Sequence, residues 1–86
     1  MPSALDLFGK QVKKLRLERQ LSQEKLAEKC GYHRNQIGRI ERGEQPVSFD
    51  GVLQLSHGLA VPPLELWKQV PVQKRLPPKK SKEKDQ

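Results

Sequence analysis

Apolar residues recur at helical spacing in the first part of the chain. Leu5, Phe8, Val12 and Leu15 step by three, four and three residues, so they share one face of a helix that the pattern ends near Arg19. Residues 1–4 are expected to form a loose leader before this helix. The opposite face is polar, which predicts an amphipathic surface helix rather than a fully buried one.

Two shorter helical patterns meet at a glycine. Leu26, Ala27 and Cys30 lie three and four residues apart, on one face of a helix that Ser22 is expected to cap. Gly31 follows directly, and glycine tolerates the left-handed backbone conformation that ends many helices. The pattern therefore predicts a first short helix, which ends in a turn at Gly31.

The second short helix is predicted from about His33 to Arg42, with Ile37 and Ile40 as its buried stripe. The small side chain of Ala27 faces the crossing of the two helices and allows them to approach closely. Two helices joined by a short turn that contains glycine are typical of a helix-turn-helix.

A fourth helix is expected between Ser48, a residue type that caps helix N-termini, and the Pro62-Pro63 pair. Pro63 is well placed to begin a short fifth helix that runs to Lys68. Gly58 is expected to permit a close approach of another helix. The buried stripe of the fourth helix is predicted to contain Val52, Leu55 and Leu59, widened by Leu53 and Ala60.

The chain of 86 residues is predicted to hold one small all-α domain, residues 1–69, and a flexible basic tail, residues 70–86, expected to be disordered. The formal net charge is +7, and the tail contributes +4 of it through six Lys or Arg residues against Glu83 and Asp85. This balance favours a polyanionic partner, nucleic acid before an anionic membrane surface. The folded part carries only +3, so charge alone does not decide the function.

Other function classes find little support in the residues. Cys30 is the only cysteine and lies on an apolar helix face, which favours a packing role in a reducing compartment. His33 and His57 have no metal-ligand spacing with Cys30, and neither a phosphate-binding glycine loop nor a nucleophile motif is present. We therefore expect no enzyme, no metal, no cofactor and no membrane span, and a cytoplasmic location on the nucleoid.

The polar residues of the second short helix indicate DNA recognition. Arg34, Asn35, Gln36 and Arg39 avoid the stripe of isoleucines and so point away from the core. In the major groove, Arg pairs with guanine, and Asn or Gln pairs with adenine. The alternative interpretation is an ordinary solvated helix face, which the surrounding helix-turn-helix pattern disfavours.

The run from Leu15 to Ala27, together with Gly31 and the run from Ile37 to Gly43, resembles the lambda-repressor-like, Cro-like (XRE) family of DNA-binding domains. The similarity extends from about Leu5 to Trp67 and implies a five-helix fold. The Ile-Glu-Arg-Gly-Glu sequence that begins at Ile40 is also similar to the controller proteins of restriction–modification systems.

The resemblance implies a role for each matching position. Arg16 and Glu41 match a family pair that ties the first helix to the end of the recognition helix, and we interpret them as a structural salt bridge. His33 stands where Ser or Thr usually caps the recognition helix, and Ala60 stands where the family usually has glycine. The residues expected to read bases are Arg34, Asn35 and Arg39. The residues expected at phosphates are Gln23, Gln36, Arg42, Lys10 and His33.

Two functions from different classes are compatible with this pattern. The first is a transcriptional regulator that binds a pseudo-palindromic operator on double-stranded DNA as a homodimer and blocks or recruits polymerase. The second is an antitoxin that binds DNA and, through residues 70–86, a toxin protein. The same tail could instead follow DNA phosphates or be a solvated terminus. The residues expected at a dimer interface are Leu55, Leu59, Leu64 and Trp67.

Overall fold

The computed structural model describes residues 2–70, which contain helices and no strand. The all-α, five-helix fold expected from the sequence is thereby confirmed. Of the tail predicted over residues 70–86, residues 71–86 lie outside the described residues. The helices are α1 (Ala4–Glu18), α2 (Gln23–Cys30), α3 (Arg34–Glu41), α4 (Phe49–Leu59) and α5 (Pro63–Leu66).

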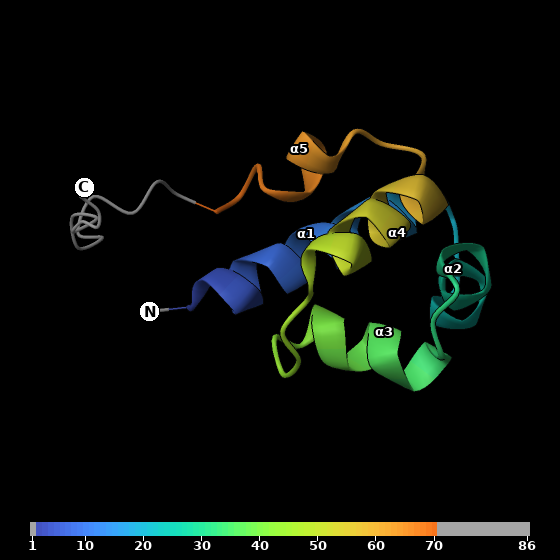
Figure 1. Ribbon diagram of the computed structural model, residues 1–86, viewed down its shortest axis with the longest axis horizontal. Coiled ribbons are helices and arrows are strands. Elements are labelled where there is room, and N and C mark those ends of the chain that lie inside the picture. Colours follow the sequence, from blue (N-terminus) through green and yellow to red (C-terminus); the bar gives the residue numbers. More distant parts are fainter. Residues whose placement is uncertain (1, 71–86) are drawn as a thin grey trace, which may run out of the picture.

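The helices surround one hydrophobic core. α1 and α4 run through the middle of the molecule, with α3 on one side of them and α5 on the other (Figure 1). α2 packs against both α3 and α4 at one end. This arrangement leaves the outer face of α3 open to solvent. The side chains that are almost completely buried in this core include Leu26, Ile37, Ile40, Leu55, Leu59 and Leu66.

α1 begins earlier than expected because its first turn contains a capping box. The Ser3 hydroxyl accepts a hydrogen bond from the Asp6 backbone N–H at 3.1 Å, and the Asp6 carboxylate accepts one from the Ser3 N–H at 3.0 Å. The Asp6 carboxylate accepts hydrogen bonds from the Ser3 N–H and also from the Ser3 hydroxyl, and these two bonds lower the pKa of Asp6 below its ordinary value. The prediction of a loose leader up to residue 4 was therefore wrong at its C-terminal end.

The helix-turn-helix has the predicted boundaries. The Ser22 hydroxyl caps α2 by accepting a hydrogen bond from the Lys25 N–H at 2.9 Å. Gly31 ends α2 with φ of +79°, the left-handed conformation that the sequence predicted for it. Ala27 and Ile37 are buried where α2 packs against α3. The turn therefore fixes α3 at the surface while its apolar stripe stays in the core.

Most of the buried stripe predicted for α4 is confirmed, but two of the predicted residues are not buried. A side chain at Gly58 would collide with Cys30 Sγ and lie 3.2 Å from Leu26 Cδ1, so the predicted close approach of another helix is confirmed. Leu53 and Ala60 do not widen the buried stripe, because both are exposed. Ala60 instead ends α4 with φ of +57°, so the left-handed turn forms without the glycine usual there.

α5 closes the core with fewer residues than expected. Pro63 begins the helix as predicted, but the helix ends at Leu66 rather than at Lys68. The ring of Trp67 packs against Phe8 with their centroids 5.1 Å apart. Val70, which the sequence assigned to the tail, packs against the core. Between residues 2 and 70 no helix is long and apolar enough to cross a membrane.

Candidate nucleic-acid interface

The start of α3 is fixed by His33. Its ring nitrogen Nδ1 accepts a hydrogen bond from the Asn35 N–H at 3.2 Å, and Gln36 Oε1 accepts one from the His33 N–H at 2.9 Å. His33 therefore acts as an N-cap, as Ser or Thr would. The contact uses the carbonyl oxygen of Gln36 and leaves its amide nitrogen as the group available to a phosphate.

The polar face of α3 is exposed, as the sequence predicted. Arg34, Asn35 and Arg39 all face solvent, while Ile37 and Ile40 are at most 1% exposed. This face borders a shallow polar depression of about 650 Å³ between α3 and the amino end of α2. The predicted DNA-contacting residues that line the depression are Gln23, Arg34, Asn35, Arg39 and Arg42.

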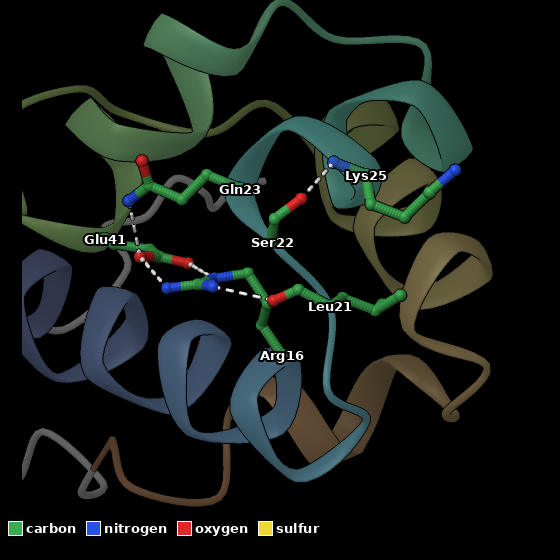
Figure 2. A network of polar contacts seen from close by, with 6 residues as sticks. All are labelled: Arg16, Leu21, Ser22, Gln23, Lys25 and Glu41. Atoms are coloured by element: carbon green, nitrogen blue, oxygen red, sulfur yellow. Dashed lines mark hydrogen bonds and ion pairs between the residues drawn. The ribbon is translucent and has the colours of Figure 1, made fainter.

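A buried ion pair holds α3 against α1. Arg16 Nε donates to Glu41 Oε2 at 2.6 Å and Arg16 Nη2 donates to Glu41 Oε1 at 3.2 Å, and the two side chains are 8% and 3% exposed. Arg16 Nη1 also donates to the Leu21 carbonyl at 2.8 Å, so the guanidinium joins three segments (Figure 2). The geometry matches the structural role expected for this pair.

The same hydrogen-bond network includes Gln23, the residue of α2 that is predicted to contact a phosphate. Gln23 Nε2 donates to Glu41 Oε1 at 3.0 Å, which orients the amide at the first residue of α2 (Figure 2). Backbone N–H groups at a helix N-terminus favour anions. Lys10 is exposed on α1 but is not part of the depression.

Two loop residues that the sequence did not indicate contact Arg39 in the last turn of α3 and Arg42, which follows α3 as its C-cap. Arg39 Nε donates to Gln45 Oε1 at 3.2 Å. Arg42 Nε and Nη2 donate to the two carboxylate oxygens of Glu44 at 2.9 and 3.3 Å. These contacts lower the pKa of Glu44 and raise that of Arg42. No local sequence signal marks them, because they depend on how the loop after α3 folds back.

The residues predicted at a dimer interface fall into two groups. Leu55 and Leu59 are fully buried in the core of this domain, so they cannot contact a second copy directly. Leu64 and Trp67 are 81% and 45% exposed. Leu64 belongs to α5 and Trp67 follows it directly, and α5 lies on the other side of α1 and α4 from α3 (Figure 1). Phe49, which the sequence analysis did not select, is 79% exposed.

The remaining chemistry of the described residues is limited. Cys30 is buried, and burial raises the pKa of its thiol to about 11, so the thiol stays protonated at neutral pH. Its contacts with α4 fit the packing role inferred from the sequence. Residues 2–70 contain no group of three His, Cys, Asp or Glu side chains that could hold a metal ion.

α2, the turn at Gly31 and α3 form a helix-turn-helix, and the polar face of α3 is exposed to solvent. Residues 12–66 match the helix-turn-helix family. The chain therefore belongs to this family and is of the XRE type, as the sequence resemblance indicated.

More specifically, the chain is similar to controller proteins of restriction–modification systems. Control protein C.BamHI of Bacillus amyloliquefaciens is 46% identical over 61 residues, which cover 70% of this chain and 75% of the relative. The structure of controller protein C.AhdI from Aeromonas hydrophila superposes with a TM-score of 0.71 at 40% identity, over 72% of this chain and 94% of that one.

The structure of a third similar protein was determined in complex with DNA. The structure of controller protein C.Esp1396I, a tetramer in complex with its natural 35-base-pair operator, superposes with a TM-score of 0.71 at 28% identity. The match covers 78% of this chain and 88% of that one. The resemblance to controller proteins that the sequence suggested is confirmed by these relatives.

Proposed function

We propose that this protein is a sequence-specific, DNA-binding transcriptional regulator that binds a pseudo-palindromic operator as a dimer. One observation carries the proposal: Arg34, Asn35 and Arg39 share the exposed face of a helix that is fixed by a buried ion pair. A rigid helix with this set of donors and acceptors suits the major groove, where base edges present distinct hydrogen-bonding patterns.

The neighbouring groups would set the position of that helix on the duplex. Gln23 begins α2, where backbone N–H groups attract a phosphate, and Arg42 lines the same depression. Phosphate contacts fix register and orientation without reading sequence. Base contacts from Arg34, Asn35 and Arg39 would then provide the selectivity. The operator complex of C.Esp1396I supports this assignment, because that protein has the same fold.

A dimer would present two recognition helices to two half-sites. A single helix reads few base pairs, and dimers of helix-turn-helix proteins bind half-sites about one helical turn, ~34 Å, apart. Leu64 and Trp67 are exposed, and α5, which contains Leu64 and ends just before Trp67, lies on the other side of α1 and α4 from α3 (Figure 1). A second copy could cover these two side chains while both copies of α3 remain free for DNA.

The experiment that tests this function is selection of binding sites from a randomised duplex library at near-physiological salt. We expect enrichment of an inverted repeat whose half-site centres lie about one helical turn apart. Salt-sensitive binding to bulk DNA without enrichment of any sequence would contradict the proposal, because electrostatic attraction alone gives that result.

Replacing Leu64 with glutamate is expected to shift the protein from dimer to monomer at micromolar concentration. In a two-fold interface each side chain occurs twice, so loss of two buried leucines weakens the dimer by roughly 3 kcal/mol or about a hundredfold. Because Leu64 is 81% exposed, the fold itself should persist. Sedimentation of both proteins, with operator affinity measured in parallel, provides the test.

The matched control is Leu17→Glu, since Leu17 is 55% exposed but lies on α1. This variant should remain dimeric. A wild-type protein that is already monomeric at micromolar concentration and keeps full operator affinity would rule out the proposed dimer.

A further inference from the structure

Two arginines near the end of α3 are held by the loop in different ways. Arg39 makes one bond, from Nε to the neutral amide oxygen of Gln45 at 3.2 Å. Arg42 makes two bonds, from Nε and Nη2 to the Glu44 carboxylate. Both arginines belong to the depression beside α2, so the difference concerns the proposed DNA-binding surface itself.

We propose that Gln45 is a positioning residue that fixes the Arg39 guanidinium for base recognition and so contributes to operator selectivity. This inference rests on the proposed function, in which Arg39 reads a base. Among residues 2–70 the two terminal nitrogens of Arg39 have no hydrogen-bond partner, and they form the edge that can pair with guanine O6 and N7. Because the Gln45 amide is neutral, it does not compensate the charge of Arg39, and the Glu44 carboxylate attracts Arg39 without a hydrogen bond to it.

The contact between Glu44 and Arg42 differs from that between Gln45 and Arg39. The Glu44 carboxylate occupies Nε and Nη2, two of the three guanidinium nitrogens, and stays ionised because the hydrogen bonds from Arg42 lower its pKa. Arg42 therefore has less capacity for a bidentate base contact and a charge that is already partly balanced. The exposed pair is weak enough to yield to a DNA phosphate. The contacts of Gln45 and Glu44 thus favour a base contact for Arg39 and a contact with the DNA phosphate backbone for Arg42.

The position of Gln45 relative to α3 is well defined. The Glu44 N–H donates to the Arg39 carbonyl at 2.9 Å, which ties the loop directly to the last turn of α3. Gln45 is half-buried and precedes Pro46, which restricts its backbone to extended conformations. A fixed acceptor can hold Arg39 in one rotamer before DNA binds. The entropy lost on ordering this long side chain is then smaller at the moment of binding.

The test measures single-base discrimination by the full chain. The duplexes are the selected operator, the same operator with the base pair read by Arg39 exchanged in both half-sites, and an unrelated sequence, each at several salt concentrations. Gln45→Ala should lower operator affinity by about two- to tenfold, the cost of immobilising one long side chain, and should lower discrimination at that base pair equally. Binding to the unrelated duplex and its salt dependence should not change.

Two further variants separate positioning from charge. Gln45→Glu keeps an acceptor oxygen, so discrimination at the base pair should be retained while the added negative charge weakens binding to every duplex. Glu44→Gln removes a negative charge beside Arg42 and should strengthen binding to every duplex, with a salt slope steeper by about one per subunit. It should leave discrimination unchanged.

Failure of this inference can be distinguished from failure of the proposed function. If the wild type selects no sequence, the proposed function fails. If Arg39→Ala abolishes discrimination at one base pair but Gln45→Ala preserves it, Gln45 does not position Arg39. If Arg39→Ala weakens all duplexes equally, Arg39 contacts a phosphate and the inference is overturned as well.

Discussion

Replacing Glu41 with alanine is expected to destabilise the domain by about 3–5 kcal/mol, because removal of one partner leaves the other charge buried and unpaired. The affected charge is Arg16, whose side chain is 8% exposed and bonded through Nε and Nη2 to the Glu41 carboxylate. The substitution also removes the acceptor for Gln23 Nε2. Denaturant unfolding of both proteins measures the difference.

Glu44→Ala is the matched control for this substitution. Glu44 lies three residues further along and pairs with Arg42, but both side chains of that pair are more than half exposed. Exposed ion pairs contribute little to stability because water screens them, so the control should unfold close to the wild type. A Glu41→Ala variant as stable as the Glu44→Ala variant would show that the buried pair does not hold α3 in place.

A double variant separates the stability of the fold from the orientation of the proposed DNA-binding surface. Replacing Arg16 with Met and Glu41 with Leu removes both charges, and such exchanges are often neutral or stabilising. We therefore expect most of the stability to return. The Gln23 amide would still lack its acceptor, so operator affinity should remain below that of the wild type. Recovery of both properties would indicate that Gln23 needs no orientation by Glu41.

The sequence predicted the elements whose signals are local. Ser22 and Ser48 cap helices because a hydroxyl suits the first turn, and Gly31 ends α2 because it tolerates a positive φ. Ile37 and Ile40 are buried because their spacing places them on one face of a helix. Each of these signals can be recognised from residues that are close together in the sequence.

The features that the sequence did not predict depend on contacts between elements. Leu53 is exposed although it is apolar, because the packing of α4 against α2 and α1 leaves it outside the contact. Leu55 and Leu59 are in the core rather than at a dimer surface for the same reason. Spacing defines one face of a helix, but the partners of that helix decide how wide the buried part is.

The proposed DNA-binding surface also combines features that the sequence predicts with contacts that only the fold creates. The exposed face of α3 follows from periodicity, so Arg34 and Arg39 could be selected from the sequence. Glu44 and Gln45 could not, because their contacts with α3 require the loop to fold back over the helix end. Ser3 and Asp6 form a capping box with a recognisable spacing, which was missed because the apolar pattern begins after it.

The second large effect is expected at Gly9, where alanine should destabilise the domain by about 1–3 kcal/mol or more. In most helix interiors, replacing glycine with alanine stabilises by up to about 1 kcal/mol, so the expected sign is reversed here. A Cβ atom at Gly9 would collide with the Ile40 carbonyl oxygen and lie 2.7 Å from that of Glu41. These are backbone atoms at the end of α3, which cannot move aside as a flexible side chain can.

Gly38→Ala is the matched control, because Gly38 also lies inside a helix. The nearest atom to a Cβ there is Arg42 Nη1 at 3.2 Å, the end of an exposed side chain that can shift. This variant should be neutral or more stable in thermal unfolding. Gly9→Ala should melt at a lower temperature than the wild type. Equal or higher stability of Gly9→Ala would show that α1 and α3 do not depend on their close approach.

The same substitution should affect DNA binding at temperatures where the variant is still folded. To accept a methyl group at Gly9, α1 must move away from the last turn of α3, the turn that contains Glu41. Such a shift would change the angle of α3 relative to α2, and with it the distance between Gln23 and the side chains proposed to read bases. Operator affinity should therefore fall more than affinity for unrelated DNA, because only specific binding requires that geometry.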